Sequence, residues 1–248
     1  MTNGANLPVM VEVNNVSMMF NFYKEKIDSL KEYFVRLMKG NLHYEEFWAL
    51  RDISFKMEKG ESMGIIGRNG SGKSTLLKLI AGVMKPSAGN VAVYGSVAPI
   101  IELGTGFDPE LTARENIYLN GAVLGYSRVG INNKYDEIVA FSELEDFMEI
   151  PLKNFSTGMY GRLGFAIATI NKPDILIVDE VLSVGDFKFQ IKCEEKIQEL
   201  LRDGTTLLFV SHNAGQVMNL CKRAVWIEHG HMMAAGGSED VCRQYAAS

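Results

Sequence analysis

The feature that most restricts the fold is the segment GRNGSGKS at residues 67–74, which matches the pattern G-x-x-x-x-G-K-[ST] in full. The apolar segment SMGIIG (62–67) precedes it, and KSTLLKLIAGVM (73–84) follows with helical periodicity. Glycines in such a loop let backbone N–H groups surround phosphate oxygens without interference from a Cβ atom. A Gly-rich turn that binds nothing is the alternative, and the full match between a strand and a helix disfavours it. We therefore predict a nucleotide site.

The side chains of the loop have separate expected contacts. Lys73 would supply a compact positive charge for the β- and γ-phosphates, and the Ser74 hydroxyl can ligate Mg²⁺. The expected nucleotide contacts are Gly67, Asn69, Gly70, Ser71, Gly72, Lys73, Ser74 and Thr75.

The rest of the chain alternates short apolar strands with helices. DILIVDE, TTLLFVSH and RAVWIEHG are rich in Val, Ile and Leu and are separated by helical segments, which is typical of a parallel sheet covered on both faces. VMVEVNNVSMMF (9–20) and WALRDISFKMEKGE (48–61) predict an antiparallel β subdomain near the N-terminus. We predict one α/β domain with a P-loop NTPase core at about 1–108 and 165–248. A helical subdomain at about 109–164, containing ARENIYLNGAVLGY and NKYDEIVAFSELEDFM, interrupts this core.

Two carboxylates end the apolar segment ILIVDE (175–180). Asp179 would lie at the carboxyl edge of the sheet, where α/β proteins gather their ligands, and would hold Mg²⁺ directly or through water. Glu180 is placed to orient or deprotonate the attacking water. His212 follows another apolar segment, LLFVSH, and we expect it near the γ-phosphate. Solvated acids and a structural histidine are the alternatives, which the phosphate loop disfavours.

The composition excludes several function classes. With 47% hydrophobic and 22% charged residues, the chain of 248 residues is typical of a soluble globular protein. No apolar segment reaches the ~18–20 residues that cross a bilayer, and no signal peptide precedes the first strand, which predicts a cytosolic protein. A net charge of −5 argues against nucleic-acid binding. The three cysteines are widely spaced and predict buried thiols rather than a disulfide or metal site.

With these motifs, nearly the whole chain resembles the ATP-binding subunit of ABC transporters. The resemblance rests on GRNGSGKS, FSTGM (155–159), ILIVDE, SVGD (183–186) and VSH (210–212), in that order. It implies a homodimer that sandwiches ATP between the phosphate loop of one copy and the signature loop FSTGM of the other. Ser156 and Gly158 would then meet the γ-phosphate held by Lys73 of the second copy, and Asp186 would lie at the same interface. A helix N-terminus with a hydroxyl group suits that role.

The chain departs from the family pattern in two places, and one further position has several candidates. Met159 stands where the signature loop usually has Gln. The segment IIELGTGFDPE (100–110) contains no Gln, so Glu102 is the candidate for the Gln-loop contact to Mg²⁺ or water, with Leu103 as the alternative position. For the aromatic residue that stacks on adenine, Phe20 is the first candidate; the alternatives are Phe22, Tyr23 and Trp48.

The segments NFSTGMYGRLGFAIAT and VDEVLSVGDFKFQIKC resemble those of polysaccharide exporters, with the O-antigen type the most similar and the teichoic acid and capsule types as alternatives. This resemblance implies a permease dimer in the membrane, a lipid-linked polysaccharide as cargo and a place at the cytoplasmic face of the inner membrane. No C-terminal carbohydrate-binding domain is expected. A soluble ABC ATPase of DNA repair or translation and a non-hydrolysing regulatory module are less consistent with this single acidic domain and its intact motifs.

An amphipathic insertion is expected at 22–47. Apolar residues recur at helical spacing through Ile27, Leu30 and Phe34, and basic residues enrich the segment; these are Lys24, Lys26, Lys31, Arg36 and Lys39. Two interpretations stay open: a helix that rests on the membrane surface near the permease, and a helix packed on its own domain.

Overall fold

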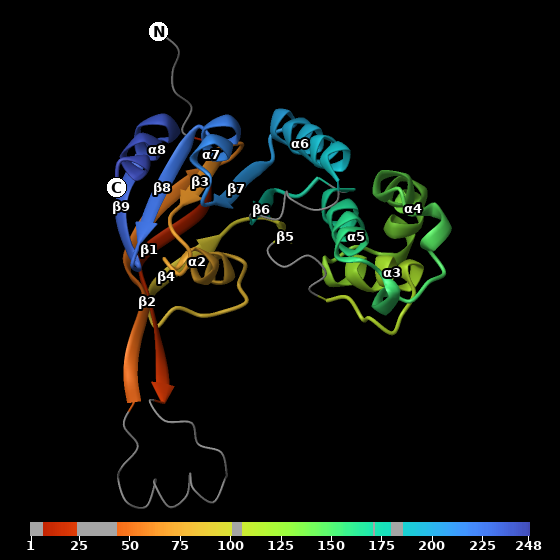
Figure 1. Ribbon diagram of the computed structural model, residues 1–248, viewed down its shortest axis with the longest axis horizontal. Helices are drawn as coiled ribbons and strands as arrows, with labels where there is room; N and C mark the ends of the chain where they lie inside the picture. Colours follow the sequence, from red (N-terminus) through yellow and green to blue (C-terminus); the bar gives the residue numbers. More distant parts are fainter. Residues whose placement is uncertain (1–6, 24–43, 101–105, 171, 180–185) are drawn as a thin grey trace, which may run out of the picture.

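The computed structural model describes residues 7–23, 44–100, 106–170, 172–179 and 186–248 (Figure 1). These residues form two sheets and a separate block of helices. Among them, no helix combines the length and the apolar character needed to cross a bilayer.

The central sheet, sheet B, has the strand order β5-β6-β7-β3-β8-β9. Neighbouring strands from β5 to β8 run parallel, whereas β9 is antiparallel to β8. The strands are β3 (Ser62–Ile66), β5 (Val97–Ile100), β6 (Ile175–Val178), β7 (Thr206–Ser211), β8 (Arg223–Glu228) and β9 (His231–Gly237). The mostly parallel sheet predicted from the apolar segments is thus confirmed, and the antiparallel edge strand β9 is an addition to it.

The central strands β3, β6 and β7 are buried at every residue, because both faces of the sheet are covered there. Ile177 and Leu208 face a core shared with the other sheet and with α2 (Lys73–Ile80), while Val178 and Phe209 face a second core. Three helices cover that second face: α6 (Phe187–Arg202), α7 (Ala214–Leu220) and α8 (Ser238–Ala246). In Figure 1 they lie together along one side of the strands.

Sheet A is antiparallel, with the order β2-β1-β4, and consists of β1 (Val9–Tyr23), β2 (Tyr44–Glu58) and β4 (Ala88–Val93). The hairpin of β1 and β2 stays paired as far as Tyr23 and Tyr44 and reaches past the body of the molecule (Figure 1). The two ends of the predicted insertion at 22–47 lie in this hairpin. The helix expected within it falls on 24–43, outside the described residues.

The helical block contains α3 (Ala113–Val123), α4 (Arg128–Ser142) and α5 (Thr157–Ile170) around its own apolar core. Helix α4 begins five residues before the predicted segment because the Ser127 side chain accepts a hydrogen bond from the backbone N–H of Gly130. It ends at Glu143, whose backbone is left-handed with φ 57°. The block lies beyond the β5–β6 end of sheet B (Figure 1).

Candidate nucleotide site

The parallel strands β6, β7 and β3 are neighbours, so their carboxyl ends meet at one edge of sheet B. Ile66 of β3 is in register with Ser211 of β7, and Val178 of β6 is in register with Phe209. The phosphate loop, Asp179 and His212 follow these strand ends directly. Three segments that are far apart in the sequence thus reach the same edge, as the strand-end argument predicts.

The phosphate loop folds tightly between β3 and α2, and it needs a glycine at both Gly67 and Gly72. A Cβ atom at Gly67 would lie 2.1 Å from the carbonyl oxygen of Ile227. Gly72 has φ 108°, and a Cβ atom there would lie 2.5 Å from the carbonyl oxygen of Ala49. Gly70 also has a positive φ, of 79°, but no atom within 4 Å of a built Cβ, so the loop is open on that side. Gly72 forms the N-cap of α2 without a side-chain cap, which leaves the start of the helix suited to an anion.

The Lys73 side chain folds back over the loop. Its Nζ atom donates hydrogen bonds to the carbonyl oxygens of Gly67, at 2.7 Å, and Arg68, at 2.9 Å, and only 7% of the residue is exposed. The ammonium group is therefore held inside the loop at the N-terminal end of α2. A fixed positive charge there can meet the terminal phosphates of a nucleotide.

An open pocket of about 550 Å³ lies over the loop. This volume is in the range usual for small-molecule sites. The described residues that line it are Phe47, Ala49, Asn69, Gly70, Gly72, Lys73, Ser74, Thr75 and Asp179. The structure thus gathers most of the expected contacts into one site. Gly67 and Ser71 also belong to the loop but are buried. The Ser71 hydroxyl has no hydrogen-bond partner among the described residues.

Phe47 is the aromatic residue of this pocket, a position that the sequence prediction missed. Its side chain is half exposed (51%) although it is large and apolar. Phe20, the predicted residue, is its cross-strand partner and packs against the core of the two sheets instead. Phe47 is therefore a further candidate for the aromatic residue that stacks on adenine, beside Phe20. Trp48 contacts the Arg51 guanidinium, 5.3 Å from its ring, and Phe22 and Tyr23 have no described side chains.

Some of the residues expected to bind a magnesium ion lie together in this pocket. The Ser74 hydroxyl and the Asp179 carboxylate line the same pocket, and both offer the oxygen ligands that Mg²⁺ prefers. Among the described residues no three His, Cys, Asp or Glu side chains form a metal cluster. A site of few protein ligands completed by phosphate oxygens is usual for Mg²⁺. Glu102, its alternative Leu103, and the expected catalytic Glu180 lie outside the described residues.

His212 is exposed in the turn between β7 and α7, and it is not among the described residues that line the pocket. Its neighbours are fixed. The Ser211 hydroxyl accepts from the backbone N–H of Asn213 at 3.0 Å and donates to Gln216 at 2.9 Å. The Asn213 side chain caps α7. The turn therefore presents His212 from a rigid base at the nucleotide edge of the sheet.

The signature loop begins α5. The Ser156 hydroxyl accepts a hydrogen bond from the backbone N–H of Met159 at 3.2 Å, as an N-cap does. The Met159 side chain is half-buried and packs against the core of the helical block. Gln at this position would place an amide there, so the departure from the family pattern has a packing explanation. Neither Ser156 nor Gly158 is among the described residues that line the pocket of the same chain.

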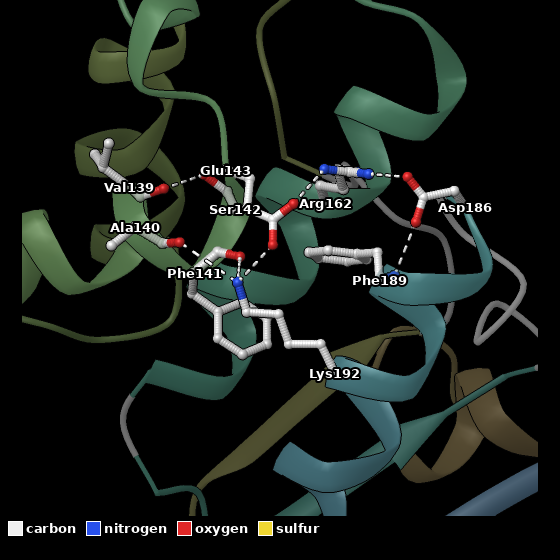
Figure 2. A network of polar contacts seen from close by, with 9 residues as sticks. All are labelled: Val139, Ala140, Phe141, Ser142, Glu143, Arg162, Asp186, Phe189 and Lys192. Carbon is white, nitrogen blue, oxygen red and sulfur yellow. Dashed lines mark hydrogen bonds and ion pairs between the residues drawn. The ribbon is translucent and has the colours of Figure 1, made fainter.

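Asp186 caps α6 by accepting a hydrogen bond from the backbone N–H of Phe189 at 2.9 Å. It also pairs with Arg162 of α5, at 2.7 Å between Nη2 and Oδ2 (Figure 2). The Phe189 N–H holds the pKa of the Asp186 carboxyl below its usual range, and Arg162 acts in the same direction. This pairing was not predicted from the sequence, which assigned Asp186 to a dimer interface only.

Comparison with known proteins gives the family. The family described as ABC transporter matches residues 50–183. The O-antigen export system ATP-binding protein RfbB of Klebsiella pneumoniae is 48% identical over 210 residues, which are 85% of this chain and 84% of that protein. The teichoic acids export ATP-binding protein TagH of Listeria monocytogenes is 41% identical over 237 residues, 96% of this chain and 70% of that protein.

A solved dimeric ATP-binding cassette, bound to ADP and Pi in a post-hydrolysis state, has the same fold. Its TM-score is 0.73 at 22% identity, with 92% of this chain and 99% of that chain covered. The fold, the pocket over the phosphate loop and the match through residues 50–183 agree. The chain belongs to the ABC transporter family.

Proposed function

We propose that this chain is the ATP-hydrolysing subunit that powers export of a lipid-linked cell-surface polysaccharide of the O-antigen type across the inner membrane. The observation that carries the proposal is the pocket over the phosphate loop, in a chain 48% identical to an O-antigen export ATP-binding protein. Export of teichoic acid is the second candidate, because TagH is also 41% identical over 96% of the chain.

In the proposed reaction, Lys73 and the backbone N–H groups of the loop hold the phosphates, and Phe47 stacks on the base. Ser74 and Asp179 would hold Mg²⁺, which would supply positive charge against the negative charge that develops on the phosphates. Glu180 orients or deprotonates the attacking water, and His212 contacts the γ-phosphate. The fixed Lys73 ammonium and the lining by Ser74 and Asp179 support these roles.

A second copy of the chain would complete the site. Ser156 and Gly158 of one copy meet the γ-phosphate held by Lys73 of the other, and Asp186 lies at the same interface. ATP then binds the closed dimer better than the open one, and hydrolysis removes the shared ligand, so the copies separate. The open pocket and the Ser156 cap support this arrangement, and a relative of the same fold is dimeric.

The membrane permease would dock on the helical block. Helix α3 exposes Leu119 (37%) and Val123 (67%), one turn apart, and Val129 of α4 is 68% exposed. Exposed apolar residues that share one helix face suit a partner helix. The chain would bind there as a peripheral subunit on the cytoplasmic face of the membrane.

We propose a nucleotide-binding core at about 1–108 and 165–248 and a helical subdomain at about 109–164. The hairpin of β1 and β2 would carry residues 24–43 to the membrane surface. Reversing the charge of the five basic residues of this segment tests that role. Unchanged export and membrane association would exclude it and favour packing on the domain itself.

The proposed function is tested by measuring ATP hydrolysis of the purified full chain against its concentration. If two copies share the site, the rate of hydrolysis per chain rises with chain concentration. If Glu180 orients or deprotonates the attacking water, hydrolysis is lost in Glu180→Gln. A rate per chain that is independent of concentration would contradict the shared site. Co-purification with the membrane permease, and accumulation of lipid-linked polysaccharide when Lys73 is replaced by Ala, test the export role. Accumulation of a teichoic acid precursor instead would favour the second candidate.

A further inference from the structure

Four charged side chains cross the seam between the helical block and the core (Figure 2). Arg162 of α5 donates from Nη1 to Glu143 at 3.0 Å and from Nη2 to Asp186 at 2.7 Å. The other Glu143 oxygen accepts from Lys192 of α6 at 3.0 Å. We call Lys192, Glu143, Arg162 and Asp186 the charge chain. Lys192 lies within α6 and Asp186 is the N-cap of the same helix. Glu143 is the C-cap of α4, and Arg162 lies in α5.

Lys192 does more than pair with a carboxylate. Its Nζ atom also donates to the carbonyl oxygen of Phe141, at 2.9 Å, in the last turn of α4. A cation there satisfies a carbonyl group that has no partner within its own helix and opposes the negative end of the helix dipole. A side chain of the core thus holds the end of a helix of the helical block.

Aromatic rings partly shield the charge chain from water. Phe141 packs against the cores of both regions and lies 5.8 Å from both Phe165 and Phe189. The Arg162 guanidinium lies over the Phe189 ring at 4.7 Å, and its side chain is 17% exposed. The guanidinium is thus partly shielded from water, whereas the Glu143 and Asp186 side chains are 40% and 64% exposed, so solvent screens their side of each contact.

Both carboxylates stay charged at neutral pH. The hydrogen bond from Lys192 lowers the pKa of Glu143, as the Phe189 N–H does for Asp186. The chain of alternating charges is therefore complete under the conditions in which the protein hydrolyses ATP.

We propose that Arg162, Glu143 and Lys192 are positioning residues for ATP hydrolysis. They hold α5, and with it Ser156 and Gly158 at its start, at a fixed place relative to the core helix α6. The proposal rests on the proposed role of Ser156 at the phosphate of a second copy. Arg162 follows Ser156 by less than two helical turns, about 9 Å along the axis. A tilt of α5 at Arg162 therefore displaces Ser156, and misplacement by about 1 Å can slow a reaction about 10²-fold.

The first test separates hydrolysis from nucleotide binding in the full chain. Arg162→Gln and Lys192→Met should lower kcat about tenfold, because Ser156 is no longer held in place. The dissociation constant of trinitrophenyl-ATP, which occupies the pocket of one chain, should change less than about twofold. Lys196→Met is the matched control, because Lys196 pairs within α6 with Glu199, at 3.1 Å, and leaves the charge chain intact. A kcat of Arg162→Gln equal to that of the control would overturn the proposal.

Rescue by conservative variants separates positioning from general stability. Lys192→Arg should recover most of the activity, since any cation can meet one carboxylate and one carbonyl. Arg162→Lys should not, because one ammonium group cannot reproduce the two directed bonds of the guanidinium fork. All variants are assayed well below their melting temperatures. Loss of kcat that disappears on cooling, or equal rescue by both variants, would assign the charge chain a structural role only.

The position of the helical block can be measured directly. Spin labels at Val129→Cys on α4 and Tyr94→Cys after β4 lie on exposed residues, and the three native cysteines are buried. Arg162→Gln should broaden the distance distribution between the labels, and Lys196→Met should leave it unchanged. An unchanged distribution in Arg162→Gln would overturn the proposal. If ATP hydrolysis by the unmodified chain does not depend on chain concentration, a site shared by two copies is excluded. The distances between the labels still show whether the charge chain holds the helical block against the core.

Discussion

The phosphate loop and the charge chain hold their parts in place by opposite means. The loop consists of consecutive residues, 67–75, whose backbone is fixed by glycines and by the Lys73 ammonium. The charge chain joins single side chains of three helices, from Glu143 to Lys192. The first is a local structure that tolerates few substitutions, and the second depends on how two regions pack. Substitutions in the two regions should therefore differ in size and in what they change.

The largest effect is expected from Lys73→Ala. Loss of the fixed ammonium at the terminal phosphates should lower ATP hydrolysis roughly 10²–10³-fold, as the loss of one charge-stabilising donor does in other enzymes. Turnover of the full chain at saturating ATP measures this. Lys85→Ala, an exposed residue after α2, is the control and should stay within about twofold. Comparable turnover in the two variants would remove Lys73 from the phosphate site.

Gly72→Ala should destabilise the loop strongly. The new Cβ atom meets a positive φ and lies 2.5 Å from the Ala49 carbonyl oxygen, so the loop must move. Gly82→Ala is matched to it, since Gly82 also has a positive φ, of 73°, but nothing within 4 Å of the added atom. We expect about 1 kcal/mol for Gly82→Ala, from backbone strain alone, and about 3 kcal/mol or more for Gly72→Ala. Urea unfolding of both variants checks this, and equal losses would exclude the close approach as a cause.

The sequence predicts what depends on local pattern and on strand ends. The loop and Asp179 are found because a motif and an apolar strand fix where they lie, and the same reasoning brings His212 to that edge. Phe47 was missed because the length of a hairpin depends on pairing between distant strands, here Phe20 with Phe47. Met159 could be explained only when its packing against the helical block was known. The charge chain leaves no pattern in the sequence, since its members are joined by tertiary contacts alone.

Phe47→Ala should weaken ATP binding about tenfold. An aromatic ring stacked on a base contributes roughly 1–3 kcal/mol. Phe20→Ala is the comparison, because Phe20 pairs with Phe47 but packs against the core. That change should lower stability by about 2–4 kcal/mol and alter ATP affinity less than about threefold. Isothermal titration with ATP and thermal unfolding separate the two. A larger loss of affinity in Phe20→Ala would return the stacking role to the residue predicted from the sequence.

The smallest effect concerns the charge chain and pH. The pKa of Glu143 is lowered from its usual value in the folded protein, chiefly by the hydrogen bond from Lys192, so its charge stabilises the fold at neutral pH. This contribution is lost as the pH falls through the lowered pKa, where the carboxyl is protonated. Because the Glu143 side chain is 40% exposed, solvent screening limits its contribution to a few tenths of a kcal/mol, which corresponds to about 1 °C in Tm. Glu143→Gln should therefore melt slightly below the unmodified chain at pH 7, and the difference should shrink as the pH falls through the lowered pKa. Circular dichroism melts at decreasing pH test the sign. A difference that does not shrink as the pH is lowered would mean that Glu143 acts through packing rather than through its charge.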